Sequence, residues 1–299
     1  MNFKKQTFII LLVICVLTLQ SFALENSLLW KVSGNGLTKP SYIFGTHHLI
    51  PLSFLDTVNG LNDAFEQTEQ TVGEVDMSNM LEMQMQMMQH AMMPEGVTYQ
   101  SLLSEDDFML LDSTLTSLTG TGLAQMGQLK PTLLGLSISV LLYQRYYPET
   151  ASGENLDIHF QQEAVKRSRP AIGLESIENQ IHVLFEISSI ERQAESLMCM
   201  IKHPEMLKEM IDNLHELYFA HNINALYELW KEDANSPCVS TEEERNALNK
   251  DRNLRWLDKL PAIMSEKSSF IAVGALHLPG EDGLIEGLRR LGYTVEAVK

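Results

Sequence analysis

The stretch FIAVGALH, residues 270–277, decides the fold of this 299-residue chain. Its first four residues predict a short buried strand, and Gly274 and His277 follow where that strand ends. Residues 283–291 predict a helix that Gly292 ends, and residues 293–295 predict another strand. Apolar strands separated by helices indicate an α/β fold around a central mixed sheet with some parallel pairing.

A similar stretch, YIFGTHHLIP, occupies residues 42–51. It follows an apolar run at 28–32 and a segment of turn residues, which is the pattern of a β-hairpin. A helix over 54–68 and a strand over 71–75 are expected next. Both stretches contain an apolar residue, a glycine, two variable positions, a histidine, a leucine and a nearby proline. This likeness suggests that the sheet consists of two duplicated α/β halves.

The remaining sequence is mostly helical. We predict a large helical insertion from residue 78 to about 167, a strand over 170–174, and helices from 177 to about 261, with a break at 235–237. Residues 24–299 then form one domain. Eight methionines gather at the start of the insertion, and core packing is favoured for them over a peptide-binding groove or copper binding. They are Met77, Met80, Met83, Met85, Met87, Met88, Met92 and Met93.

Residues 1–23 predict a signal peptide, with Lys4 and Lys5 before an apolar run and a small-residue cleavage site at 21–23. An uncleaved anchor is the alternative, but the run is short for a spanning helix. We therefore expect an exported protein, periplasmic or extracellular, that begins near Leu24. No later apolar run is long enough to span a bilayer, so no integral membrane segment is expected after signal cleavage.

Cleavage leaves two cysteines, Cys199 and Cys238, in an oxidising compartment. A disulfide between them and two unpaired thiols both stay open, because spacing alone cannot place their Cα atoms. The formal net charge of −17 disfavours nucleic acid and anionic membrane surfaces. It is compatible with cations, including metal ions and basic peptides, although a solvated acidic surface that keeps the protein soluble is the simpler interpretation.

The main candidate site combines His48, His277 and Glu74. Both histidines follow strands, and ligands bind at the carboxyl ends of strands in open α/β sheets. Glu74 ends the strand that should neighbour that of His48. Two histidines and a carboxylate are a recurrent ligand set for a catalytic divalent metal with open positions. Taken singly, each histidine is more often structural, and Glu74 with Asp76 could instead cap the following helix.

Other residues are weaker candidates. His47 could be a further ligand, although in an extended segment its side chain points away from that of His48. Glu175 follows a predicted strand and could orient a ligand, act as a base or cap a helix. Asp157 is interpreted as a helix cap. Arg252 lies on a predicted helix, where it is either solvated or able to bind a substrate carboxylate or an oxyanion.

In their order and spacing, these motifs resemble the TraB/GumN family, which is similar to the Tiki proteases that inactivate Wnt proteins. The resemblance rests on the segments LWKV before YIFGTHH, on GEVD around Glu74, on GLES around Glu175, on Arg252-Asn253, and on VGALHLPG at 273–280. It implies a fold shared with erythromycin esterases and haem-binding ChaN-like proteins. It also implies a site of His48, His277 and Glu74, supported by Glu175 and Arg252, with manganese or cobalt favoured and zinc as an alternative.

Three functions follow as hypotheses. The leading one is an exported metal-dependent hydrolase that cleaves a peptide or protein substrate, in which metal-bound water attacks the peptide carbonyl. The second is a metal-independent, esterase-like hydrolase with a histidine as general base. The third is a protein that binds haem, a metal or a peptide without turnover.

Overall fold

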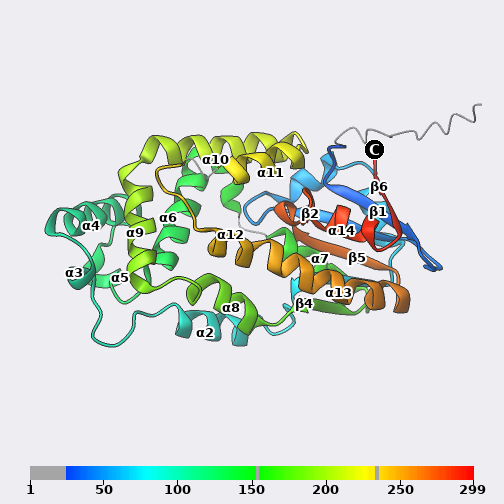
Figure 1. Ribbon diagram of the computed structural model, residues 1–299, viewed down its shortest axis with the longest axis horizontal. Helices are drawn as coiled ribbons and strands as arrows, with labels where there is room; N and C mark the ends of the chain where they lie inside the picture. Colours follow the sequence, from blue (N-terminus) through cyan, green and yellow to red (C-terminus); the bar gives the residue numbers. More distant parts are fainter. Residues whose placement is uncertain (1–24, 153–154, 233–235) are drawn as a thin grey trace, which may run out of the picture.

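A six-stranded sheet forms one end of the molecule, and helices form the other (Figure 1). This computed structural model describes residues 25–152, 155–232 and 236–299. The predicted signal peptide, residues 1–23, and part of the predicted break at 235–237 lie outside them. Within the described residues, no helix is long and apolar enough to cross a membrane.

The sheet is mixed, as predicted, and its strands follow the spatial order β4-β3-β5-β2-β1-β6. β1 is antiparallel to both of its neighbours, and the other pairs are parallel. The predicted hairpin is the β1-β2 pair. These elements confirm the predicted α/β fold, whereas the duplication of its halves stays a prediction. The strands are β1 (Leu29–Gly34), β2 (Ser41–Thr46), β3 (Gln70–Val75), β4 (Ala171–Glu175), β5 (Ser269–Gly274) and β6 (Tyr293–Ala297).

The two Gly-x-x-His motifs meet because β2 and β5 are neighbouring parallel strands, with Thr46 opposite Gly274. Gly45 allows this close approach, and Gly274 leaves room for the Glu74 side chain. A Cβ atom on Gly45 would lie 3.0 Å from the Cα atom of Ala275, and one on Gly274 would lie 3.3 Å from Oε1 of Glu74. The fully buried side chains of β2 and β5 anchor both motifs in the core.

Five helices cover the sheet or connect its strands: η1 (Leu52–Thr57), α1 (Leu61–Glu66), α7 (Leu156–Lys166), α13 (Lys250–Glu266) and α14 (Leu284–Arg290). The helix predicted over 54–68 is in fact two, η1 and α1, because Gly60 adopts a left-handed conformation between them. The helix predicted to end near Pro261 continues to Glu266, with the proline inside it.

A second hydrophobic core lies between α3, α4, α5, α6 and α9, at the opposite end from the sheet (Figure 1). Tyr99, Leu111, Leu134 and Leu197 are among its buried residues. Its helices are α3 (Tyr99–Leu102), α4 (Glu105–Thr119), α5 (Leu123–Met126), α6 (Pro131–Tyr146) and α9 (Ile190–Lys202). The remaining ones are α2 (Met80–His90), η2 (Pro148–Ser152), α8 (Ile177–Phe185), α10 (Pro204–Phe219), α11 (Ile223–Glu232) and α12 (Glu242–Leu248).

The predicted insertion, 78 to about 167, and this helical end do not consist of the same helices. Its last helix, α7, packs into the core of the sheet through Leu156 and Phe160. Helix α9, which follows β4 in the chain, packs with α4 and α6 instead. The helical end is therefore assembled from segments on both sides of β4.

The prediction that the methionine cluster packs in the core is wrong for most of α2. No residue of α2 is buried, and Met85 and Met88 are 64% and 52% exposed. Helix α2 lies at the surface beside α8 (Figure 1). Met87 packs beside Ala91, Ile181 and Phe185. Packing at Met87 covers part of the helix and leaves Met85 and Met88 exposed.

A disulfide joins Cys199 and Cys238, so the structure decides between the two alternatives that the sequence left open.

Candidate active site

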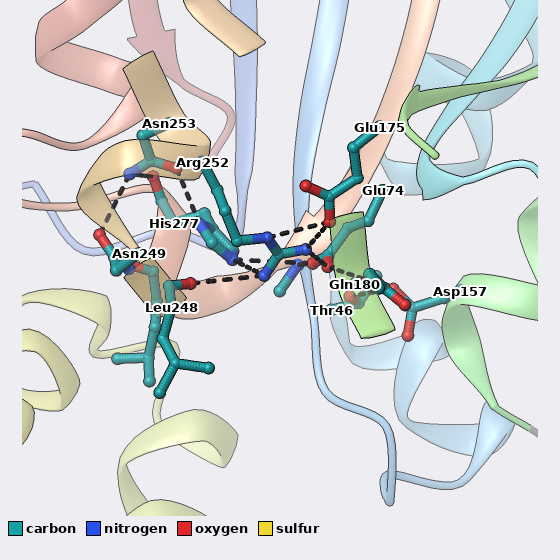
Figure 2. Close-up of polar contacts among 12 residues, drawn as sticks. Thr46, Glu74, Asp157, Glu175, Gln180, Leu248, Asn249, Arg252, Asn253 and His277 are labelled. Atoms are coloured by element: carbon teal, nitrogen blue, oxygen red, sulfur yellow. Dashed lines mark hydrogen bonds and ion pairs between the residues drawn. The ribbon is translucent and has the colours of Figure 1, made fainter. Parts of the chain in front are cut away.

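Arg252 of α13 is the centre of the site, and its guanidinium lies between Glu74 and His277 (Figure 2). Nε donates to Oε1 of Glu175 at 3.0 Å, and Nη2 donates to Glu175 and to Glu74. Nη1 donates to Nε2 of His277 at 3.1 Å and to the Leu248 carbonyl at 3.4 Å. A guanidinium has five N–H donors, so all of them are engaged. The predicted role for Arg252, binding a substrate carboxylate or an oxyanion, does not fit this arrangement.

Two buried carboxylates balance the charge of Arg252. Glu74 is the penultimate residue of β3. This strand pairs with β4 and β5, and not, as the sequence predicted, with β2, the strand before His48. Oε1 of Glu74 accepts from the backbone N–H of Gly274 at 2.8 Å. Burial alone raises the pKa of Glu74, but Arg252, His48 and His277, which is protonated only at the acidic pH where Glu74 titrates, outweigh it and lower that pKa to about 2. Glu175, the last residue of β4, is 6% exposed, and its Oε2 has no hydrogen-bond partner among the described residues. The structure thus brings Glu74, Glu175 and Arg252 together, as the sequence predicted.

His277 is buried and neutral. It belongs to η4 (Ala275–His277), and its Nδ1 lies 2.7 Å from Oδ1 of Asn253, while its ring packs 4.5 Å from that of Trp256. Because Nε2 accepts a hydrogen bond from Arg252, Nδ1 carries the proton and donates to Asn253. Burial lowers the pKa of His277 to about 4, despite the opposing charge of Glu74.

His48 has the opposite environment. Its Nδ1 lies 2.7 Å from Oδ2 of Asp157, while the side chain is 64% exposed and lines a pocket. Asp157 itself is buried and also accepts a 2.5 Å hydrogen bond from the hydroxyl of Thr46. The charge of Asp157 is the main cause that raises the pKa of His48, to about 9. The imidazolium form therefore predominates at neutral pH.

The His48–Asp157 pair and the Glu74–Arg252 pair face one pocket of about 280 Å³. His48, Glu74, Asp157 and Arg252 line it, together with the amide side chains of Asn155 and Gln180. Figure 2 shows Arg252, Glu74 and Gln180 in line between His277 and Asp157. Four apolar residues complete the wall: Met77, Val183, Leu184 and Leu248.

Asp157 is the functional candidate that the sequence interpretation missed. It was interpreted as a helix cap, but Asn155 caps α7 by accepting from the Asp157 backbone N–H, and the Asp157 carboxylate bonds His48. No pattern in the sequence shows this, because 109 residues separate the two partners. Asn253 is a second such residue, because its bond to Nδ1 of His277 is visible only in the structure.

His277 and Glu175, which contact Arg252, do not line the pocket, and neither do two other predicted candidates, His47 and Asp76. The ring of His47 packs 5.2 Å from that of Tyr218 and accepts a hydrogen bond from the backbone of Leu49. Its side chain thus contributes to packing, as its expected direction away from His48 implied. Asp76 accepts from the backbone N–H of Ser78, as a turn residue does.

A divalent ion held by His48, His277 and Glu74 does not fit this arrangement of side chains. The possible ligand atoms of His48, His277 and Glu74 do not all lie within 4.8 Å of one another. Among the described residues, the group of three that does is Cys199, His203 and Cys238. Nε2 of His277 lies 3.9 Å from Oε1 of Glu74, but the guanidinium of Arg252 donates to both residues. A metal ion at that point would be repelled by the positive charge of the Arg252 guanidinium.

One protein family matches nearly the whole of this chain. The model of the TraB/PrgY/gumN family matches residues 28–297, which include every residue of the pocket. No curated protein matches the chain. No solved structure matches it either.

Proposed function

This chain belongs to the TraB/PrgY/gumN family, and from the geometry of its site we propose that it is an exported hydrolase. The reaction is hydrolysis of a carbonyl compound, a peptide or an ester, with His48 as general base. The observation that carries the proposal is the His48–Asp157 pair, 2.7 Å apart, at the wall of an open pocket. Export and the peptide substrate are part of this proposal.

The pair supplies acid–base chemistry. Asp157 accepts the Nδ1–H of His48, which orients the ring and leaves Nε2 as the atom that exchanges protons. In the neutral form, Nε2 takes a proton from water as the water oxygen attacks the carbonyl carbon. The resulting imidazolium, stabilised by Asp157, then donates that proton to the leaving alcohol or amine. A carboxylic acid and an alcohol or amine are the products.

Arg252 acts indirectly, as a positioning residue. With every N–H engaged, it holds Glu74 at the pocket wall. Oε1 of Glu74 accepts one hydrogen bond within the described residues, from Gly274, so it keeps a lone pair for a substrate N–H or a water. Asn155 and Gln180 also line the pocket. Nε2 of Gln180 donates to Oε2 of Glu74 at 3.3 Å, and its second N–H suits the carbonyl oxygen of the substrate.

The apolar part of the pocket favours a peptide with an apolar side chain. Val183, Leu184 and Leu248 lie on one pocket wall with Met77. Met77 also lines a second pocket of about 450 Å³, with Met80, Ile158 and Val165. Two pockets that share one wall residue can hold successive side chains of an extended peptide.

A metal-dependent peptidase is the second candidate, and one observation favours it. Both histidines engage Nδ1 with an oxygen acceptor, Asp157 or Asn253, which is the usual support for a histidine that binds a metal through Nε2. This candidate requires the guanidinium of Arg252 to leave its place between Glu74 and His277. Manganese, cobalt or zinc would then supply polarisation of the carbonyl and activation of water.

Cleavage assays on the purified mature protein distinguish these functions. A peptide library and a set of ester substrates are incubated with wild type, His48→Ala and the control His182→Ala, whose exposed histidine lies on α8. We expect cleavage by wild type and by the control, with and without a chelator, and none by His48→Ala. Cleavage that is lost on chelation and restored by manganese or cobalt supports the metal-dependent candidate. Peptide or haem binding without cleavage contradicts both.

A further inference from the structure

We propose that Cys199, His203 and Cys238 form a binding site for one thiophilic metal ion, Zn²⁺ or Cu⁺, when their disulfide is reduced. The sulfur atoms of Cys199 and Cys238 are joined in the disulfide, and a ring nitrogen of the exposed His203 lies within 4.8 Å of both. They are the one group of three such donors gathered this closely within the described parts of the chain. None of them lines the active-site pocket, so this site is independent of the proposed function.

The fold holds the three residues in place. Cys199 and His203 are four residues apart at the end of α9, so they lie on the same side of its last turn. Their neighbours Leu197 and Leu207 are buried in two different cores, which fixes the junction of α9 and α10. Cys238 approaches from the segment before α12, with its Cα atom 5.6 Å from that of Cys199.

This spacing suits a metal as well as a disulfide. Two thiolates on one tetrahedral zinc ion lie about 3.8 Å apart, given a Zn–S bond of about 2.3 Å. Side-chain rotation in the two cysteines can provide that separation without moving the helices. Two thiolates and an imidazole are preferred by zinc and by Cu⁺. The thioether of Met206 is close by, since it contacts Ser236, whose hydroxyl accepts from the backbone N–H of Cys238.

Metal binding and the disulfide exclude each other. A disulfide sulfur carries no charge and is a poor ligand, whereas a thiolate is a strong one. Two equivalents of an external thiol reduce the bond, forming two cysteine thiols and the disulfide of the external thiol. The metal ion then displaces the two thiol protons. A bound ion in turn keeps both sulfurs from re-forming the disulfide.

The test compares oxidised and reduced mature protein. The protein is reduced with a phosphine, freed of reductant without air, and titrated with Zn²⁺ and Cu⁺ against a chromophoric chelator. Co²⁺ is used as a spectroscopic probe, because thiolate ligands give it a charge-transfer band. We expect the reduced protein to bind one equivalent more than the oxidised protein. Because the oxidised protein keeps His48, Glu74 and His277, this difference excludes any ion bound there.

Two variants establish the ligands. His203→Ala is expected to weaken binding to the reduced protein at least tenfold, whereas His90→Ala, which changes an exposed histidine on α2, leaves it unchanged. Cys199→Ser is expected to remove the charge-transfer band. Circular dichroism of His203→Ala in its oxidised form checks folding with the disulfide intact. Equal metal uptake by oxidised and reduced protein, or equal affinity in His203→Ala and wild type, overturns the proposal.

Discussion

The two Gly-x-x-His motifs have the same pattern but opposite environments. They follow neighbouring parallel strands, yet the His277 side chain is 8% exposed while the His48 side chain is 64% exposed. The partner of Nδ1 also differs, an amide oxygen of Asn253 in one motif and the carboxylate of Asp157 in the other. The pKa values follow this difference, about 4 for His277 and about 9 for His48.

This contrast separates a reactive histidine from a supporting one. His277 uses both ring nitrogens to hold other residues of the site, Asn253 and Arg252. His48 uses one, and the other is available to a substrate. Environments that push the pKa values of two groups apart are typical of acid–base sites. A sequence motif can therefore place two histidines side by side without giving them the same role.

The largest expected effect is on turnover by His48→Ala. Removal of the general base should reduce kcat/KM by about 10³-fold. Because Asp157 is buried and loses its ion-pair partner, while the His48 ring itself is exposed, the free energy of unfolding at neutral pH should fall by only about 1 kcal/mol. Steady-state kinetics and urea unfolding of the same preparation measure both quantities. If His48→Ala retains its activity, His48 is not the general base and has a structural role.

Arg252→Met should have the largest effect on stability. It leaves Glu74 and Glu175 buried without their cation, which should lower the free energy of unfolding by about 3–5 kcal/mol. Arg255→Ala is the matched control, because Arg255 lies on the same helix but is 46% exposed and 3.9 Å from Glu175. It should change stability by less than about 0.5 kcal/mol. Equal losses in the two variants would contradict the central position of Arg252.

His277→Ala should be more destabilising than His48→Ala. The substitution removes a buried ring and leaves Asn253 and Arg252 each short of one partner, at a cost of about 2–4 kcal/mol. Urea unfolding of the two histidine variants, side by side, gives the comparison directly. The same small loss in both would show that burial does not distinguish the motifs.

Asp157→Asn should shift the pH dependence of activity. In wild type, kcat/KM should rise as pH increases towards about 9, because the imidazolium of His48 must lose its proton to act as a base. Removal of the Asp157 charge should lower the midpoint towards the ordinary histidine value, about 6.5, and reduce the limiting rate. A midpoint that stays in place would mean that Asp157 does not control His48.

The smallest expected effects are on stability against pH, with opposite sign for the two histidines. The pKa of His277 is lowered on folding, so its contribution is complete above about 6.5 and is lost as pH falls through about 4. The pKa of His48 is raised, so its contribution is complete below about 6.5 and is lost as pH rises through about 9. Urea unfolding of wild type and each alanine variant from pH 4 to 9 resolves the two windows.

Several parts of this architecture could be predicted from the sequence because they depend on local pattern. Apolar runs separated by helices predicted the strands, and the positions just after those strands included Glu175 and both motif histidines. The methionine helix α2 shows the limit of such reasoning. Its methionines suit a core helix, but none of its residues is buried, because the covering of a helix depends on the elements that pack against it.

By itself the sequence determined the α/β fold and the meeting of His48, Glu74 and His277 at one edge of the sheet, because strand direction and side-chain alternation are local properties of the backbone. Only the tertiary structure decided what each of them contacts. Asp157 reaches His48 across 109 residues of sequence, and Arg252 reaches Glu74 across 178. Those two contacts set the charges of the site, because burial and neighbouring charge, which shift a pKa, exist only after α7 and α13 have packed against the sheet.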